Sequence, residues 1–207
     1  MLHRPEKLTT LYGMHTRPKI AIQISYWVMI LLVFAIPARA TQVDEELRAL
    51  LKVAAMEADS FEDHFDAQVW LVDMSGRLER FIPDNEYRLQ LLKAVHRQAT
   101  RAQLQPELVL SVIQIESHFN RYAISRVGAQ GLMQVMPFWK NEIGRSEDNL
   151  TDMNTNLRYG CTILKHYLKR SKGDLVDALA RYNGSLGKTV YPEKVLVAWE
   201  KSWFTNN

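Results

Sequence analysis

The chain has 207 residues, 47% of them hydrophobic, which suggests one domain or one domain with appendages. Its formal net charge of +3 arises in the first 40 residues, where five basic side chains face one acidic one, so it gives no reason to expect a nucleic-acid partner. The single cysteine, Cys161, excludes an intrachain disulfide, and we expect it to be a buried thiol on an apolar helix face.

Residues 1–40 have the pattern of a secretory signal peptide. A basic start precedes an apolar run at residues 20–36, and Ala38 and Ala40 supply small side chains at the spacing that a signal peptidase reads. We predict cleavage after Ala40 and an exported protein. The alternative is an uncleaved membrane anchor, although this run is shorter than the roughly 20 residues that a span needs.

The apolar pattern after residue 40 has helical spacing nearly everywhere. A first helix is predicted from Asp44 to about Phe61, with an acidic start of the kind that helix N-termini favour. A second is predicted over about 65–81, where Gly76 leaves a hairpin as the alternative. We assign residues 41–95 to an N-terminal helical extension, whose first helix would pack outside the main domain.

The rest of the chain also predicts helices. One covers residues 86–101, and another starts at Pro106, whose missing N–H costs nothing at the first helical position. Because apolar residues lie nearly all round this second helix, we expect it at the centre of the core. Residues 119–131 look like a loop. Further helices are predicted at 138–143, 154–170, 174–182 and 192–203, giving a mainly α protein with one compact domain.

Several familiar kinds of site find no support in the pattern. There is no glycine-rich phosphate loop, no Gly-x-Ser-x-Gly elbow and no metal-ligand spacing among the six histidines, so neither a metal nor a cofactor is expected. What remains is Glu116, which ends the apolar run at 109–115. It is either a solvated residue at an ordinary helix end or a carboxylate with apolar neighbours, whose raised pKa would suit a general acid.

Residues 116–139 carry a longer pattern, "ESHFNRYAISRVGAQGLMQVMPFW". Two further blocks follow, "DMNTNLRYG" at 152–160 and "ALARYNGS" at 178–185. The three blocks together resemble the soluble-lytic-transglycosylase-like (SLT) family, which are lysozyme-like enzymes that cut peptidoglycan. The resemblance covers about residues 98–200, and it implies a lysozyme-like catalytic domain at 96–207 and a periplasmic location in a bacterial envelope.

The resemblance implies a reaction with one catalytic carboxylate, where ordinary glycosidases use two. Glu116 would protonate the glycosidic oxygen between N-acetylmuramic acid and N-acetylglucosamine, while the substrate's N-acetyl group supports the charge at C1. Glu116 would then take the proton of the sugar's own 6-hydroxyl, which closes on C1 and leaves a 1,6-anhydro end. One residue serves both steps when its pKa lies near the working pH.

The resemblance also assigns substrate-binding roles to five residues. Ser117 would bond near Glu116 or the sugar's acetamido group, or else satisfy helix backbone. The backbone of Met133 and the side chain of Gln134 would line the groove. Tyr182 would orient the acetamido carbonyl or Glu116, or else be a core tyrosine, and Asn183 would be a groove contact or a helix cap. The three tryptophans Trp139, Trp199 and Trp203 are expected to pack in the core and not to bind sugar.

One departure from the family pattern is found at residues 184–187, which read Gly-Ser-Leu-Gly where the family often has Ala-Gly-Pro-Gly. Two other functions remain open: a muramidase that uses water, and a wall-binding scaffold of an envelope complex that has lost catalysis. The expected partner is the peptidoglycan glycan strand, and we expect a monomer. The sequence identifies no protein partner.

Overall fold

The computed structural model describes residues 39–56, 59–60 and 63–204. The predicted signal peptide therefore lies almost entirely outside the described residues. From residue 44 onward, the described residues form one compact unit. None of the described helices is both long enough and apolar enough to cross a membrane.

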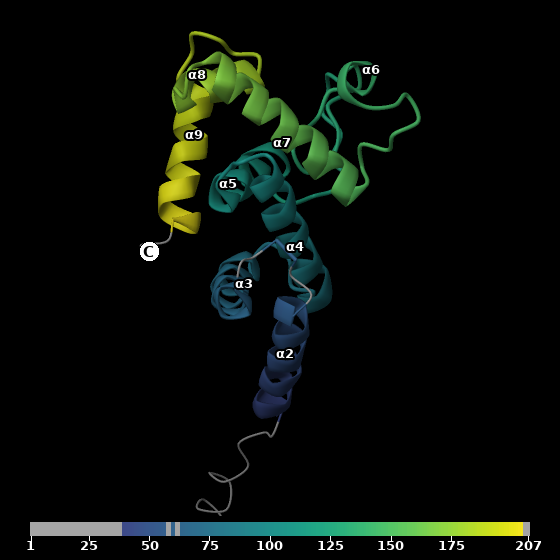
Figure 1. The fold of residues 1–207 in the computed structure, drawn as a ribbon, viewed down its shortest axis with the longest axis vertical. Helices are drawn as coiled ribbons and strands as arrows, with labels where there is room; N and C mark the ends of the chain where they lie inside the picture. Colours follow the sequence, from purple (N-terminus) through teal and green to yellow (C-terminus); the bar gives the residue numbers. More distant parts are fainter. Residues whose placement is uncertain (1–38, 57–58, 61–62, 205–207) are drawn as a thin grey trace, which may run out of the picture. The chain divides into compact units, whose positions relative to one another are not determined.

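The described chain is helical, which confirms the mainly α prediction (Figure 1). Between residues 117 and 139 the chain forms only isolated antiparallel bridges, which pair Gln130 with Ile124 and with Val135. The helices are α2 (Arg39–Met56), α3 (His64–Leu78), α4 (Asn85–Arg101), α5 (Pro106–Ser117), α6 (Trp139–Ile143), α7 (Met153–Arg170), α8 (Leu175–Tyr182) and α9 (Val190–Ala198), and α9 continues into the π-helix η1 (Trp199–Trp203).

Aspartate caps fix where four of these helices begin. The side chain of the residue before α3, α4, α7 and α8 accepts a hydrogen bond from a backbone N–H of the first turn, and so satisfies a donor that has no partner within the helix. The caps are Asp63, Asp84, Asp152 and Asp174.

The N-terminal helices differ from the prediction in two respects. Helix α2 begins at Arg39 and not at Asp44, so its first turn holds no acidic residue and the expected acidic start is wrong. It is also not wholly outside the core, because Leu51 and Ala54 are buried in it. Helix α3 runs through Gly76 without a hairpin, since Leu71, Met74 and Leu78 make a fully buried face that outweighs one glycine on the open side.

Helix α5 lies at the centre of the core, as predicted. Its residues Leu108, Val109, Leu110, Val112 and Ile113 are at most 4% exposed. The helix packs against α4, α9 and η1, while α7 packs against α4 and α8 (Figure 1). The last turn of α5 is therefore held on several sides, and a side chain placed there has a fixed position.

The chain leaves α5 through two consecutive left-handed residues. His118 has φ 49° and is exposed, whereas Phe119 has φ 65° and is buried against Phe81 and Trp203, with ring centroids 4.9 and 5.6 Å away. Non-glycine residues seldom adopt this conformation, and here the aromatic packing of Phe119 stabilises it. The turn directs the following loop back across the end of α5, where Glu116 lies.

The predicted boundary between residues 95 and 96 falls inside α4, which is continuous from Asn85 to Arg101. The preceding helices also bond to the later part of the chain. The indole of Trp70 donates to Glu107 over 2.6 Å, and Arg77 donates to the carbonyl of Ser202 over 3.2 Å. The division into an extension and a catalytic domain stays a prediction.

Candidate active site

The loop between α5 and α6 is held in place by one buried side chain of α7. Asn156 accepts a hydrogen bond from the backbone N–H of Met133 over 2.7 Å and donates to the carbonyls of Gln130 and Leu150 over 2.8 and 2.7 Å. A Cβ atom on Gly131, whose φ is 77°, would lie 2.3 Å from the Asn156 amide nitrogen. The loop can therefore close on Asn156 only with a glycine at position 131.

Met133 is held in place through both its side chain and its backbone carbonyl. Its side chain packs so closely on Gly160 that a Cβ there would lie 2.3 Å from the sulfur. The hydroxyl of Tyr182, at the end of α8, donates to the Met133 carbonyl over 2.7 Å. Burial raises the pKa of the Tyr182 phenol well above its ordinary value, so it remains a neutral donor. These contacts join the loop to α7 and α8.

Glu116 lies in the last turn of α5 and is partly buried. Burial raises the pKa of its carboxyl from an ordinary 4.5 to about 7, the direction expected from its apolar neighbours. The hydroxyl of Tyr191, in the first turn of α9, donates a hydrogen bond of 2.6 Å to Oε1 and partly opposes this shift. Near neutral pH the group can therefore both give and take a proton.

Glu116 lines a pocket of about 150 Å³ together with Gln134, Tyr182 and Asn183, which we call the Glu116 pocket. The amide nitrogen of Gln134 donates to the carbonyls of Ala123 and Gly131, so its side chain is fixed by the loop itself. Asn183 is the C-cap of α8 and is exposed. Of the residues predicted to bind substrate, these three lie at the pocket wall with Glu116.

Ser117 and Met133, also predicted to bind substrate, do not line the Glu116 pocket. The Ser117 hydroxyl bonds to the carbonyls of Ile113 and Leu132 over 3.2 and 2.8 Å, so it ties α5 to the loop. Met133 is fully buried, and both its backbone N–H and its carbonyl are occupied by Asn156 and Tyr182. In this structure, both residues support the pocket from behind.

Two further pockets adjoin the Glu116 pocket. The lysine pocket, of about 340 Å³, contains Lys188 and Lys194 and shares Asn183 with the Glu116 pocket. The Trp139 pocket, of about 270 Å³, shares Trp139 and Ile163 with the Glu116 pocket. The Glu116 pocket is therefore continuous with further open space at Asn183 and at Trp139.

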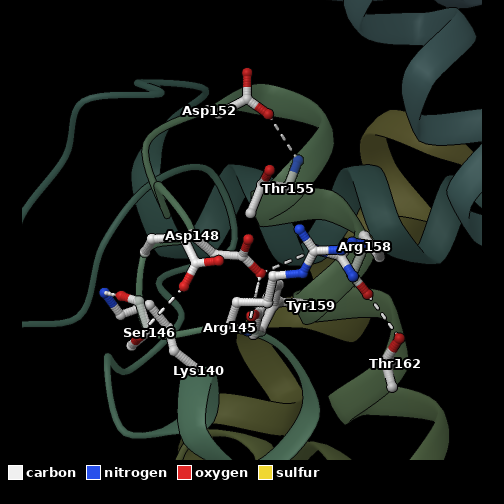
Figure 2. Close-up of polar contacts among 10 residues, drawn as sticks. Lys140, Arg145, Ser146, Asp148, Asp152, Thr155, Arg158, Tyr159 and Thr162 are labelled. Carbon is white, nitrogen blue, oxygen red and sulfur yellow. Dashed lines mark hydrogen bonds and ion pairs between the residues drawn. The ribbon is translucent and has the colours of Figure 1, made fainter.

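A polar cluster anchors the segment that follows α6 (Figure 2). Asp148 accepts hydrogen bonds from the Tyr159 hydroxyl over 2.6 Å and from Arg158 over 3.1 Å, both on α7. Its pKa is lowered, chiefly by the hydrogen bond from Tyr159. A Cβ at Gly144 would lie 1.5 Å from the Tyr159 oxygen, so only glycine fits there. The cluster fixes this segment to α7, next to the helix that carries Trp139.

Trp139 is only partly buried, although it was predicted to pack in the core. Its ring packs edge-on against Tyr167 with centroids 6.3 Å apart, and the residue is partly exposed where two pockets meet. Trp203, in contrast, is fully buried, as predicted, and its indole donates to Gln114 over 2.7 Å. No group of three His, Cys, Asp or Glu side chains within the described ranges could hold a metal ion.

The sequence did not identify Tyr191, the residue in direct contact with Glu116. Tyr191 is 75 positions from Glu116 and lies outside the three quoted sequence blocks, so only tertiary packing of α9 on α5 brings the two together. Asn156 was quoted in a block but received no role. Its buried position on α7, facing the loop, could be found only from the fold.

Comparison with known proteins agrees with the resemblance. Residues 93–194 match the family described as "Transglycosylase SLT domain". The "Transglycosylase" of Enterobacteria phage PRD1 is 34% identical over 115 residues, which are 52% of this chain and 42% of the phage protein. The "Membrane-bound lytic murein transglycosylase C" of Yersinia pestis (strain Pestoides F) is 31% identical over 115 residues, or 48% of this chain and 32% of that protein.

A solved structure is also similar, the lytic transglycosylase Slt of Pseudomonas aeruginosa in an inactive mutant form. It has a TM-score of 0.43 and 19% identity, and the match covers 75% of this chain and 35% of the other. The chain spans less than half the length of each of these relatives.

Proposed function

Because residues 93–194 match the transglycosylase SLT domain family, we propose that this chain is a peptidoglycan lytic transglycosylase. It cleaves the β-1,4 bond between N-acetylmuramic acid and N-acetylglucosamine and leaves a 1,6-anhydromuramoyl end. The observation that carries the proposal is the Glu116 carboxyl, which lines a pocket, is held by Tyr191 and has a pKa of about 7.

In the first step Glu116 is the general acid. Because Oε1 accepts the hydrogen bond from Tyr191, the proton of the neutral carboxyl resides on Oε2. Glu116 transfers it to the glycosidic oxygen as the bond from C1 to that oxygen breaks and the leaving sugar takes the electron pair. The carbonyl oxygen of the substrate's N-acetyl group bonds to C1 and carries the positive charge into the amide.

In the second step the ionised Glu116 is the base. It takes the proton of the 6-hydroxyl, whose oxygen bonds to C1 and displaces the acetamido oxygen. Glu116 ends protonated, as it began, and no water is consumed. Glu116 is the only carboxylate among the described residues lining its pocket, which supports a route with one carboxylate in place of two.

The remaining residues of the site either bind the sugar or support the wall of the pocket. Within the described chain, Oε1 of Gln134 has no hydrogen-bond partner, so it can accept a hydrogen bond from a sugar hydroxyl or amide. Asn183, at the end of α8, contacts the sugar from the same pocket. Tyr182, Met133 and Ser117 keep the pocket wall in shape. The hydroxyls of Tyr182 and Ser117 donate to backbone carbonyls, and the backbone N–H of Met133 donates to the Asn156 side chain. The "membrane-bound" name of several relatives supports an envelope location, and we retain the exported, periplasmic assignment.

Activity on peptidoglycan tests the proposal against an inactive wall-binding scaffold. Wild type and Glu116→Gln are compared by zymography in a gel that contains peptidoglycan. We expect clearing by wild type and about 100- to 10,000-fold less by the variant, because no other side chain at the pocket can supply the proton. Equal clearing, or none by a folded wild type, would count against the proposal. A muramidase would also clear the gel, and the chemical nature of the product separates the two.

A further inference from the structure

The lysine pocket holds a concentration of positive charge beside the candidate active site. Lys188 lies in the loop after α8, and Lys194 lies one turn into α9. Both are exposed, and within the described chain neither ammonium forms an ion pair. No carboxylate lines this pocket.

We propose that this pocket binds a carboxylate on the side group of the glycan, next to the bond that is cut. The proposal rests on the proposed function, since it names the part of the peptidoglycan that the pocket recognises. Tyr191 forms one wall of the lysine pocket and donates to Glu116, so a group bound there is one side chain away from the catalytic carboxyl.

The other lining residues suit a peptide-like group. Ile115 and Val190 offer apolar surface, while Asn183 and Ser185 offer hydrogen-bonding groups. Two ammonium groups attract a carboxylate from several directions without requiring one geometry, because a lysine acts as a point charge on a flexible stem. The attraction is exposed to solvent and should weaken with salt.

The loop that carries Lys188 has a defined shape. Gly184 and Gly187 have φ of 72° and 80°, and the backbone N–H of Ser185 bonds to the carbonyl of Ala180 over 2.8 Å. This is the segment where the sequence departs from the family pattern. The departure therefore lies in the wall of the lysine pocket, where it would affect recognition of the side group without altering Glu116.

Two groups in peptidoglycan carry such a carboxylate: the peptide stem, and the lactyl group that is exposed when the stem is removed. Binding is measured in a Glu116→Gln background, so that no cleavage occurs. Three soluble glycan fragments are compared: one with intact stems, one with its carboxylates amidated, and one freed of stems by an amidase. The variant adds Lys188→Gln and Lys194→Gln. Its matched control adds Lys201→Gln, an exposed lysine of η1 that lines none of the three pockets.

We expect the two lysine substitutions to weaken binding of the intact fragment about 5- to 10-fold at low salt and to leave the amidated fragment unchanged. In the intact fragment the lactyl carboxyl is amide-bonded to the stem, so this loss identifies a carboxylate of the stem. A similar loss on the stem-free fragment shows that the pocket also binds the lactyl carboxylate, and no loss there restricts it to the stem. Unchanged binding of the intact fragment, or an equal loss on the amidated one, would overturn the proposal. Turnover by the chain with Glu116 intact is measured separately, so its failure would reject the proposed function and leave the binding result to decide the pocket.

Discussion

The hydroxyl of Tyr191 donates a 2.6 Å hydrogen bond to Oε1 of Glu116. The contact joins the first turn of α9 to the last turn of α5, and it acts on the carboxyl in two ways. It fixes the side-chain rotamer, and it favours the charged form, which moderates the rise in pKa that burial causes. A single hydroxyl thus fixes the position of the proposed catalyst and moderates its proton affinity, which burial raises.

Replacing Tyr191 by phenylalanine should therefore change the pH dependence as well as the rate. Without the hydrogen bond the pKa of Glu116 rises above about 7, so the fall in kcat/KM on the alkaline side moves to higher pH. We expect kcat to fall about 10- to 1,000-fold, the range for loss of one positioning hydrogen bond. The pH–rate profile on soluble glycan strands is the measurement. Tyr122→Phe is the control, since Tyr122 is 65% exposed and lines none of the three pockets. An alkaline limb that stays in place would show that Tyr191 does not act on the ionisation of Glu116.

Burial of Glu116 should also reduce the stability of the wild-type protein as pH rises. The folded pKa of about 7 lies above the unfolded value near 4.5, so the native state must release a proton that the unfolded state has already lost. Stability that is present below pH 4.5 is lost as pH rises to about 7. We expect Glu116→Gln, which does not ionise, to be more stable than wild type by about 1–3 kcal/mol at pH 8, and by much less at pH 5. Chemical denaturation at both pH values measures this difference. A difference that is the same at both would contradict it.

Asn156→Ala should destabilise the loop that carries Met133 and Gln134. It leaves one backbone N–H and two carbonyls without their partner, and buried groups of this kind cost about 1–3 kcal/mol each when they cannot reach water. Because the contributions of neighbouring groups do not add, we expect a total loss of about 2–4 kcal/mol, together with a fall in kcat. Asn154→Ala on the same helix is the control. Its exposed amide accepts one hydrogen bond, from Arg97, and its removal should cost under about 0.5 kcal/mol.

The two tyrosines at the site should respond differently. The Tyr182 hydroxyl bonds to the Met133 carbonyl, so Tyr182→Phe removes a structural contact and should cost about 1–2 kcal/mol of stability. We expect a smaller fall in kcat than for Tyr191→Phe and no movement of the alkaline limb. Unfolding free energies and pH–rate profiles of both variants, measured side by side, test the assignment. A larger rate loss in Tyr182→Phe, with stability unchanged, would return the orienting role to Tyr182.

Much of the helical architecture could be predicted from local patterns. The start of helix α5 at Pro106 and the burial of its residues 108–113 could both be predicted, because both signals lie within a dozen consecutive residues. Gly76 left α3 open to a second interpretation, since a local penalty of about 1 kcal/mol is overruled only by packing with distant residues. The start of α2 at Arg39 could also not be predicted from the charges near a helix terminus.

The same limit holds for the candidate site: features of neighbouring residues could be predicted, and contacts between distant residues could not. Glu116 could be found because an apolar run ending in a carboxylate is a local signal, and the motif blocks supported it. The partner of each polar group could not be found this way. Tyr182 was expected beside Glu116, yet its hydroxyl reaches Met133, and the hydroxyl on Glu116 comes from Tyr191 on a helix that carries no motif. Such pairings depend on how helices cross, which one-dimensional spacing does not contain.

The mass of the cleaved glycan ends tests the central claim most directly. Peptidoglycan is digested with wild type, and the soluble products are analysed by mass spectrometry, with a Glu116→Gln digest as the control. The account predicts 1,6-anhydromuramoyl ends, lighter by one water than hydrolysed ends, and no new ends in the control digest. Hydrated reducing ends from wild type would contradict the account and identify a muramidase that uses Glu116 with water.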